Sequence, residues 1–212
     1  MNFYKIFLLS LLLFHFSNNS FAQFDASIWA GINSSSFGGN PPKDASYESI
    51  YGFCFGGDFN YHLNKEIVIA FEPSFEQSGA DIVFGNEENL FDTVITYTVK
   101  QNYFGLGILF KINTERFYVG AGLNFQLLSS ANLEHESTDI DIKNKFLDYN
   151  IVSFFNVGFK IPIGSPTLFI ELRYLQGLVS IYSGDSEYSS EIYIANFKST
   201  GLRLSTGIMF PL

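Results

Sequence analysis

Few side chains of this chain could do acid–base or nucleophilic chemistry. After the first 22 residues there are two histidines, His62 and His135, and a single cysteine, Cys54. His135 stands two positions before Ser137, and a histidine beside a hydroxyl is the smallest set of groups that nucleophilic catalysis requires. Both lie in an acidic, polar stretch that we expect to be a loop, which would hold such a pair with little pre-organisation. The sequence therefore favours a protein that is not an enzyme, with lipid modification as the alternative.

Charged residues of both signs recur at alternate positions inside otherwise apolar segments. Buried charges are tolerated only when they are paired, and residues at alternate positions of a strand share one face. We therefore expect an ion-paired network that fills an interior, rather than a conducting or substrate-binding lumen. The residues of this predicted network are Asp58, Glu72, Glu76, Lys111, Lys160, Glu171, Arg173 and Arg203.

A second group of charges is almost purely acidic and lies in the stretches between apolar segments. Oxygen-rich loops could bind calcium or magnesium, but these acids lack the ordered ligand spacing of a known metal loop. No Gly-rich phosphate loop, cysteine cluster or HExxH pattern is present either. The sequence thus predicts solvated acidic loops, no metal and no cofactor. The acids are Asp81, Glu87, Glu88, Asp92, Glu134, Glu136, Asp139, Asp141, Asp185, Glu187 and Glu191.

The opening stretch is typical of a secretory signal peptide. Lys5 precedes an apolar run from Ile6 to Phe16, and a polar segment then leads to Ala22 and Gln23. We place cleavage between Ala22 and Gln23, which leaves 23–212 as one domain. An N-terminal membrane anchor is the alternative, but the run is about half the length that a spanning helix needs.

The composition suits strands and turns rather than helices. The chain has 25 Phe, 12 Tyr and 18 Gly, and only 16% of its residues are charged. Removing residues 1–22 takes away one of 12 basic residues and none of 21 acidic ones, so the processed chain has a net charge of −10. Nucleic-acid binding is disfavoured at that charge. The single cysteine excludes an intramolecular disulfide framework.

Alternating polarity predicts eight strands whose connections alternate between short and long. Short connections are expected at 63–65, 113–115 and 163–166, with long ones near 37–49, 79–92, 130–146 and 182–194. This is the pattern of an antiparallel up-and-down barrel with one tight rim and one looped rim. The predicted strands are 26–36, 50–62, 66–78, 93–112, 116–129, 147–162, 167–181 and 195–211.

The distribution of side chains over the two faces of these strands indicates which face meets lipid. In the fourth segment Phe104, Ile108 and Phe110 share one face, whereas Gly105 and Lys111 share the other. An eight-stranded barrel has an interior only just wide enough for side chains to fill, so the large aromatic set fits better outside. Placing a lysine or arginine inside also avoids about 2–4 kcal/mol at mid-membrane depth. A transmembrane barrel is therefore predicted, with tyrosine girdles formed by Tyr51, Tyr61, Tyr97, Tyr103 and Tyr174.

Four segments carry a likeness to a known family: ASIWAGINSS, IAFEPSFEQSGA, QNYFGLGILFKI and ELRYLQGL. They resemble strands of the PorT-like outer-membrane β-barrel proteins, and the likeness spans nearly the whole processed chain. The resemblance implies an eight-stranded barrel of the bacterial outer membrane, of the kind abundant in the Bacteroidota. Most members of that family have no assigned activity.

The function that we expect is structural: a rigid barrel in outer-membrane lipid that presents long acidic loops to surface partners. A secreted, soluble carrier of lipocalin type is a further alternative. That class would show a Gly-x-Trp segment in its first strand and apolar residues turned inward. Here Trp29 follows Ser27 and Ile28, and the inward positions are polar.

Overall fold

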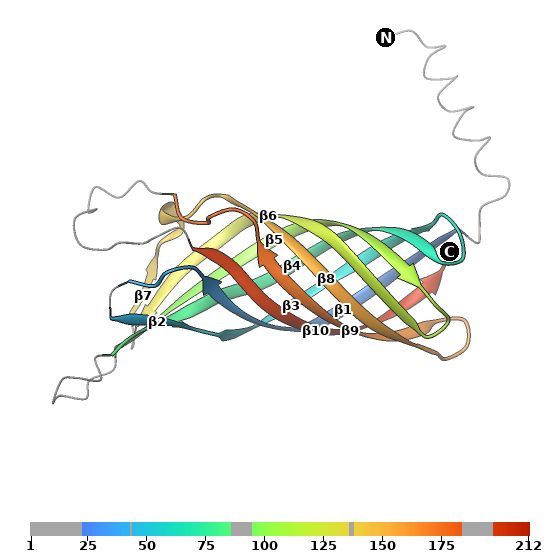
Figure 1. The fold of residues 1–212 in the computed structure, drawn as a ribbon, viewed down its shortest axis with the longest axis horizontal. Helices are drawn as coiled ribbons and strands as arrows, with labels where there is room; N and C mark the ends of the chain where they lie inside the picture. The colour runs from blue at the N-terminus through green and yellow to red at the C-terminus, as the bar shows by residue number, and fades with distance from the viewer. Residues whose placement is uncertain (1–22, 43, 86–94, 136–137, 184–196) are drawn as a thin grey trace, which may run out of the picture.

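The computed structural model describes residues 23–42, 44–85, 95–135, 138–183 and 197–212 (Figure 1). Nearly all of them lie in strands, and one short 3-10 helix follows β7. None of the described segments forms a helix with the length and apolarity that crossing a bilayer would require. The elements are β1 (Phe24–Gly38), β2 (Ala45–Glu48), β3 (Ile50–His62), β4 (Ile67–Phe84), β5 (Ile95–Asn113), β6 (Phe117–His135), β7 (Thr138–Asp141), η2 (Lys143–Lys145), β8 (Tyr149–Pro162), β9 (Thr167–Gly177) and β10 (Lys198–Pro211).

Eight of the strands close into a ring. Each pairs antiparallel with the next in the order β1, β3, β4, β5, β6, β8, β9 and β10, and β10 pairs back onto β1. The closing ladder runs from Asp25↔Pro211 to Gly38↔Lys198, so the first and last strands are joined over their whole length. The predicted all-β, eight-stranded, antiparallel up-and-down barrel is confirmed. Closure leaves no sheet edge that would need water.

The two rims differ as predicted. Tight turns and the C-terminus lie at one end of the barrel, and β2, β7 and the long connections lie at the other (Figure 1). Side chains shape the tight turns: Asn64 Oδ1 accepts hydrogen bonds from the backbone N–H groups of Glu66 and Ile67, at 2.8 and 2.7 Å. Gly164 adopts φ +109°, a conformation that favours glycine. In membrane barrels the short turns are periplasmic, so the looped end is extracellular.

The outward face of the ring is a belt of large apolar side chains. On β5 the belt runs through Phe104, Leu106, Ile108, Phe110 and Ile112, which are 46–58% exposed. Each neighbouring strand contributes a similar series, whereas the interleaved inward side chains are buried. An apolar surface of this extent is not tolerated in water, so the belt faces lipid.

The wall is taller at the looped rim than the sequence predicts. β4 continues to Phe84 and β6 to His135, into stretches that we expected to be loops, and β9 ends at Gly177 instead of 181. Two added strands explain the difference, because β2 pairs with the end of β4 and β7 with the end of β6. Alternation alone did not reveal these segments, since strands outside the membrane need no uniformly apolar face.

A β-bulge in β6 changes which residues point inward. The β5–β6 register shifts between Asn102↔Ser130 and Tyr103↔Leu128, so Ser129 is an extra residue. Leu128 and Ala131 are consequently both buried.

Tyr103, which we predicted to lie in an interfacial girdle, is 1% exposed and points inward. That prediction is wrong because Tyr103 alternates along β5 with outward residues and shares the inward face with the buried Val99 and Gln101.

The seam between β3 and β4 opens near the looped rim and is closed by side chains of β1. The β3–β4 ladder stops at Cys54↔Glu76, although both strands continue. Beyond that point Asn33 Nδ2 donates to the backbone oxygen of Gln77 at 3.2 Å. The Ser35 hydroxyl accepts from the N–H of Gly79 and donates to its carbonyl, at 2.9 and 3.1 Å. These contacts satisfy β4 backbone groups that lack a partner strand there.

We expect the refolded protein to migrate differently in a detergent gel before and after boiling. A closed ring of hydrogen-bonded strands resists detergent until heat disrupts it, and the compact form runs faster than the extended chain. The measurement is electrophoresis of paired boiled and unboiled samples. Identical migration of the two would contradict a closed barrel.

Candidate functional site

Both apolar and polar side chains point into the lumen. Three clusters of buried apolar side chains occur among the described residues, and the largest side chains there with less than 2% exposure include Arg203, Tyr103, Gln101 and Glu72. The sequence predicted inward positions that are mainly polar. That expectation is only partly right, because aromatic rings such as Phe154 and Phe169 also point inward.

A four-residue ion-pair cluster lies at the centre of the lumen. Glu72 on β4 accepts two parallel hydrogen bonds from Arg173 on β9, both 2.6 Å long. The same carboxylate accepts from Arg203 Nη2 at 3.1 Å. Glu171 completes the cluster through Arg173, at 2.9 Å to Nε and 2.8 Å to Nη2. All four residues are at most 3% exposed, and the hydrogen bonds between Glu72 and Arg173 join opposite walls of the ring directly.

The register of β9 and β10 sets the two arginines side by side, and an aromatic ring packs against each of them. Arg173 and Arg203 are directly opposite on β9 and β10, an arrangement that would repel without the two carboxylates. Arg173 lies over the Phe154 ring at 4.2 Å, and Arg203 lies over the Trp29 ring at 4.3 Å. The ring faces favour the cations and exclude water around the cluster.

A second ion pair lies nearer the tight-turn rim. Lys111 Nζ on β5 is 2.9 Å from Asp58 Oδ2 on β3 and 3.2 Å from Asn60 Oδ1. Trp29 Nε1 donates to the other Asp58 oxygen at 3.3 Å. Both charged side chains are almost fully buried. This pair joins β3 to β5, the two strands that flank β4 in the ring.

Glu76 is held by amides rather than by a cation. It accepts from Asn33 Nδ2 and Gln126 Nε2, both at 3.0 Å. Gln126 Oε1 in turn accepts from Asn150 Nδ2 at 3.0 Å, which continues the chain of amides. A cavity of about 20 Å³ borders Glu76, which is room for one water molecule. Glu76 therefore belongs to the lumen's polar contents but not to its ion pairs.

Lys160 is the one residue of the predicted network that lies apart from it. Its side chain is half-buried near the tight-turn rim, and among the described residues it forms no ion pair. Near that rim the structure has a cluster that the sequence analysis missed: His62 Nε2 lies 2.6 Å from Asp25 Oδ2, and Asn60 Nδ2 donates to Asp25 Oδ1. A signal was present, since Asp25 and Asn60 have inward parity on the two paired strands β1 and β3.

A cluster of buried apolar side chains, which we call the apolar cap, lies at the looped rim. It consists of buried side chains from strands and from the connections between them: Phe37, Ala80, Val99, Tyr103, Leu128, Ala131, Phe146, Ile181 and Phe197. Tyr47 of β2 packs against the cap, and burial raises the pKa of its phenol. The sequence did not predict this cap, because its members come from segments far apart in the chain and four of them, Phe37, Ala80, Ala131 and Phe146, lie in stretches that we expected to be solvated loops.

The acids of the looped rim are partly engaged by neighbouring strands. Asp81 accepts from Thr98, Asp139 from Asn132, and Asp141 from the backbone N–H of Lys143. No group of three or more metal-binding side chains occurs among the described residues. The remaining predicted rim acids Glu87, Glu88, Asp92, Glu136, Asp185, Glu187 and Glu191 lie outside the described residues.

The residues considered for nucleophilic chemistry are not assembled into a site in the described part of the chain. His135 Nδ1 donates to the backbone oxygen of Thr96 at 2.9 Å, and its ring stacks on Tyr97 with centroids 4.4 Å apart. Ser137 lies outside the described residues. Cys54 is 1% exposed within an apolar cluster.

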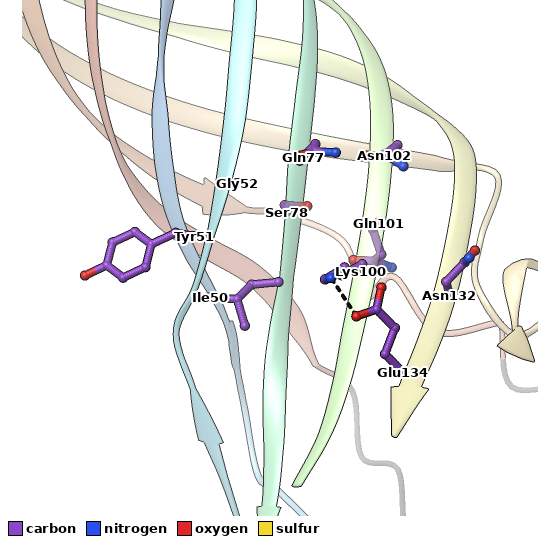
Figure 2. A pocket seen from close by; sticks show the side chains of 10 residues that line it. All are labelled: Ile50, Tyr51, Gly52, Gln77, Ser78, Lys100, Gln101, Asn102, Asn132 and Glu134. Carbon is purple, nitrogen blue, oxygen red and sulfur yellow. Dashed lines mark hydrogen bonds and ion pairs between the residues drawn. The ribbon is translucent and has the colours of Figure 1, made fainter. Parts of the chain in front are cut away.

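A polar groove of about 380 Å³ lies on the outer surface of the wall, above the apolar belt. Figure 2 shows its lining side chains on β3 to β6, with Tyr51 at one edge and Glu134 at the other. Lys100 Nζ lies 2.6 Å from Glu134 Oε2, and both side chains are substantially exposed. The groove is lined by Ile50, Tyr51, Gly52, Gln77, Ser78, Lys100, Gln101, Asn102, Asn132 and Glu134.

Two comparisons concern the sequence of the chain. A family model described as "Outer membrane protein beta-barrel domain" matches residues 16–183. No curated protein matches the chain.

Solved structures of similar shape are all distant in sequence. Neisserial surface protein A is 13% identical, with 88% of this chain and 97% of that chain covered and a TM-score of 0.47. OprG of Pseudomonas aeruginosa is 15% identical, with coverages of 90% and 98% and a TM-score of 0.47. Ail, the attachment invasion locus protein of Yersinia pestis, is 16% identical, with coverages of 89% and 99% and a TM-score of 0.45.

The substitution Glu72→Gln should destabilise the protein by about 3–5 kcal/mol, because it leaves two buried guanidinium groups short of a counter-charge. Glu134→Gln is the matched control, since it removes one charge from an exposed ion pair that contributes about 0–1 kcal/mol. Urea unfolding in micelles, followed by the fluorescence of Trp29 beside Arg203, measures both. Equal losses in the two variants would show that the central cluster is not the stabilising element.

Proposed function

The chain belongs to the outer membrane protein β-barrel domain family and resides in the bacterial outer membrane, and from that premise we propose that it is a closed, non-conducting barrel. In this proposal the barrel anchors an extracellular wall that makes surface contacts. Its predicted location is confirmed by the family, and a soluble carrier is excluded by that location. The proposed role includes no catalytic step.

The observation that carries the proposal is the central ion-pair cluster. Glu72, Arg173, Arg203 and Glu171 span the lumen with direct hydrogen bonds and are at most 3% exposed. An ion or solute would have to break these bonds in a low-dielectric interior, where separated charges are expensive. The apolar cap supports the same conclusion, because it would have to be displaced before water could enter from the cell surface.

The wall above the membrane supports a role in surface contacts. The ends of β4, β5 and β6 remain hydrogen-bonded to one another up to Phe84↔Ile95 and Thr98↔Glu134. Strands β2 and β7 widen the same sheet. A paired sheet holds its side chains more rigidly than a free loop, which lowers the entropy cost of binding a partner. Partners of the acidic loops would then meet a pre-organised surface.

The finer assignments belong to this proposal as well. We propose membership of the PorT-like barrels of the Bacteroidota, on the strength of the four segments quoted above. We also propose that residues 1–22 act as a signal peptide that is cleaved between Ala22 and Gln23, since an outer-membrane protein must be exported.

We expect the purified barrel to show no unitary conductance in planar bilayers, because the ion pairs of Glu72, Arg173 and Arg203 join opposite walls of its lumen. A general porin inserted under the same conditions is the positive control. Reproducible conductance steps whose frequency rises with the amount of barrel protein would overturn the closed-lumen proposal.

Mass spectrometry of the protein isolated from outer membranes should find a chain that starts at Gln23. If residues 1–22 stayed attached, they would add an apolar segment with one charge that the barrel does not need. Detection of an intact Met1 or of Lys5 in the membrane-embedded protein would contradict the proposed cleavage.

A further inference from the structure

We propose that the outer groove between β3 and β6 binds the uncharged sugar headgroup of a glycolipid in the outer leaflet. The proposed function assigns no ligand to this groove, so this inference goes beyond it. It stands on the position of the groove, on the chemistry of its lining and on the apolar surface directly below it.

The groove begins where the lipid-facing belt ends. The last fully apolar row of the outward face runs across β3 to β6 through Phe55, Phe75, Phe104 and Leu127, which are paired in register. The next outward positions on β4, β5 and β6 are Gln77, Asn102 and Ser130, which are also paired. A change from apolar to polar side chains at one level marks the headgroup region of the membrane. The groove therefore lies at the depth of lipid headgroups.

The lining of the groove combines donors and acceptors in the way that hydroxyl groups require. Three amide side chains line the groove, and each is hydrogen-bonded to a described residue through one end. Gln77 uses its Oε1, and Asn102 and Asn132 use their Nδ2 groups. The opposite ends are an NH2 group and two carbonyl oxygens. A sugar hydroxyl both donates and accepts, so it can bridge such groups. Figure 2 shows these side chains from β4, β5 and β6 around one hollow.

The charges around the groove favour a neutral headgroup over a phosphate. Lys100 is the one cation in the lining, and its ammonium group is already paired with Glu134 at 2.6 Å. Asp81 and Asp139 lie on the adjoining strand ends. A phosphate would meet an excess of negative charge there, whereas a sugar ring would not.

The opened seam and the aromatic belt provide room for the two parts of such a lipid. Because β3 leaves β4 beyond Cys54↔Glu76, the groove reaches about 380 Å³, within the range of small-molecule sites. Directly below it, the rings of Phe53, Phe55 and Phe75 stack with centroids 5.3–6.4 Å apart. Acyl chains can lie on this exposed apolar surface while the headgroup occupies the groove.

Native mass spectrometry of the refolded barrel in micelles tests the proposal with glucosyl diacylglycerol as the probe. The reference lipid is phosphatidylethanolamine with the same acyl chains. We expect selective retention of the glucosyl lipid, and about a tenfold or greater loss of its affinity in the double variant Gln77→Met/Asn102→Leu, which keeps volume but removes hydrogen bonds. Heat-modifiable migration of the variant checks that it is folded.

Gln176→Met is the matched control, because Gln176 is an outward amide at the upper end of the belt on β9, away from the groove. It should leave glucosyl-lipid retention unchanged. Equal retention of the two lipids, or an equal loss in the control and the groove variant, overturns the proposal. Stronger retention of a bisphosphorylated lipid A than of the glucosyl lipid overturns the neutral-headgroup assignment. If a soluble disaccharide at the same concentration displaces the glucosyl lipid completely, the proposal that the bound sugar belongs to a membrane lipid is overturned.

Discussion

The structure depends on the bidentate interaction between Glu72 and Arg173 across the lumen. These side chains come from opposite walls of the ring, and each is surrounded by residues that complete its hydrogen bonds. Charge can be enclosed here only because the pairing is direct, since an unpaired ion in this interior would cost several kcal/mol. Enclosing the charges in turn leaves the outward face free for Phe, Leu and Ile. Placing charged side chains inside and apolar side chains outside thus has two consequences: ion pairs join the walls of the lumen, and the outer surface can face lipid.

The membrane also explains why the wall changes character along its height. Within the belt, every outward position must be apolar and every backbone group must be paired within the ring. Above the belt these constraints end, and the strands carry amides, a lysine–glutamate pair and the added strands β2 and β7. Beyond Cys54↔Glu76 no ladder joins β3 to β4, and Asn33 and Ser35 bond to the β4 backbone there instead. Features suited to recognition therefore gather at the looped end.

Residues whose environment follows from strand parity were predictable. Lys111, Glu171, Arg173 and Arg203 interrupt apolar alternation on the inward side, and parity places them in the lumen whatever the exact register. Residues whose environment depends on pairing between distant segments were not predictable in this way. Leu128 and Ala131 point inward because of one bulge, and Phe146 and Phe197 are buried because they pack against each other and Phe197 packs against Phe37 of β1. Lys160 has lumen parity but lies too near the rim to reach the ion pairs.

The sequence by itself determined the eight-stranded barrel, its lipid-facing side and most of the enclosed charges, because a period of two and the cost of charge in lipid act on each strand separately. Only the tertiary structure decided which charges pair, how the mouth is capped and where the outer groove lies. Those features arise from contacts such as Glu72 with Arg173, which are 101 residues apart, or Asn33 with Gln77, which are 44 apart. Such contacts depend on ring closure and register, which no local pattern encodes.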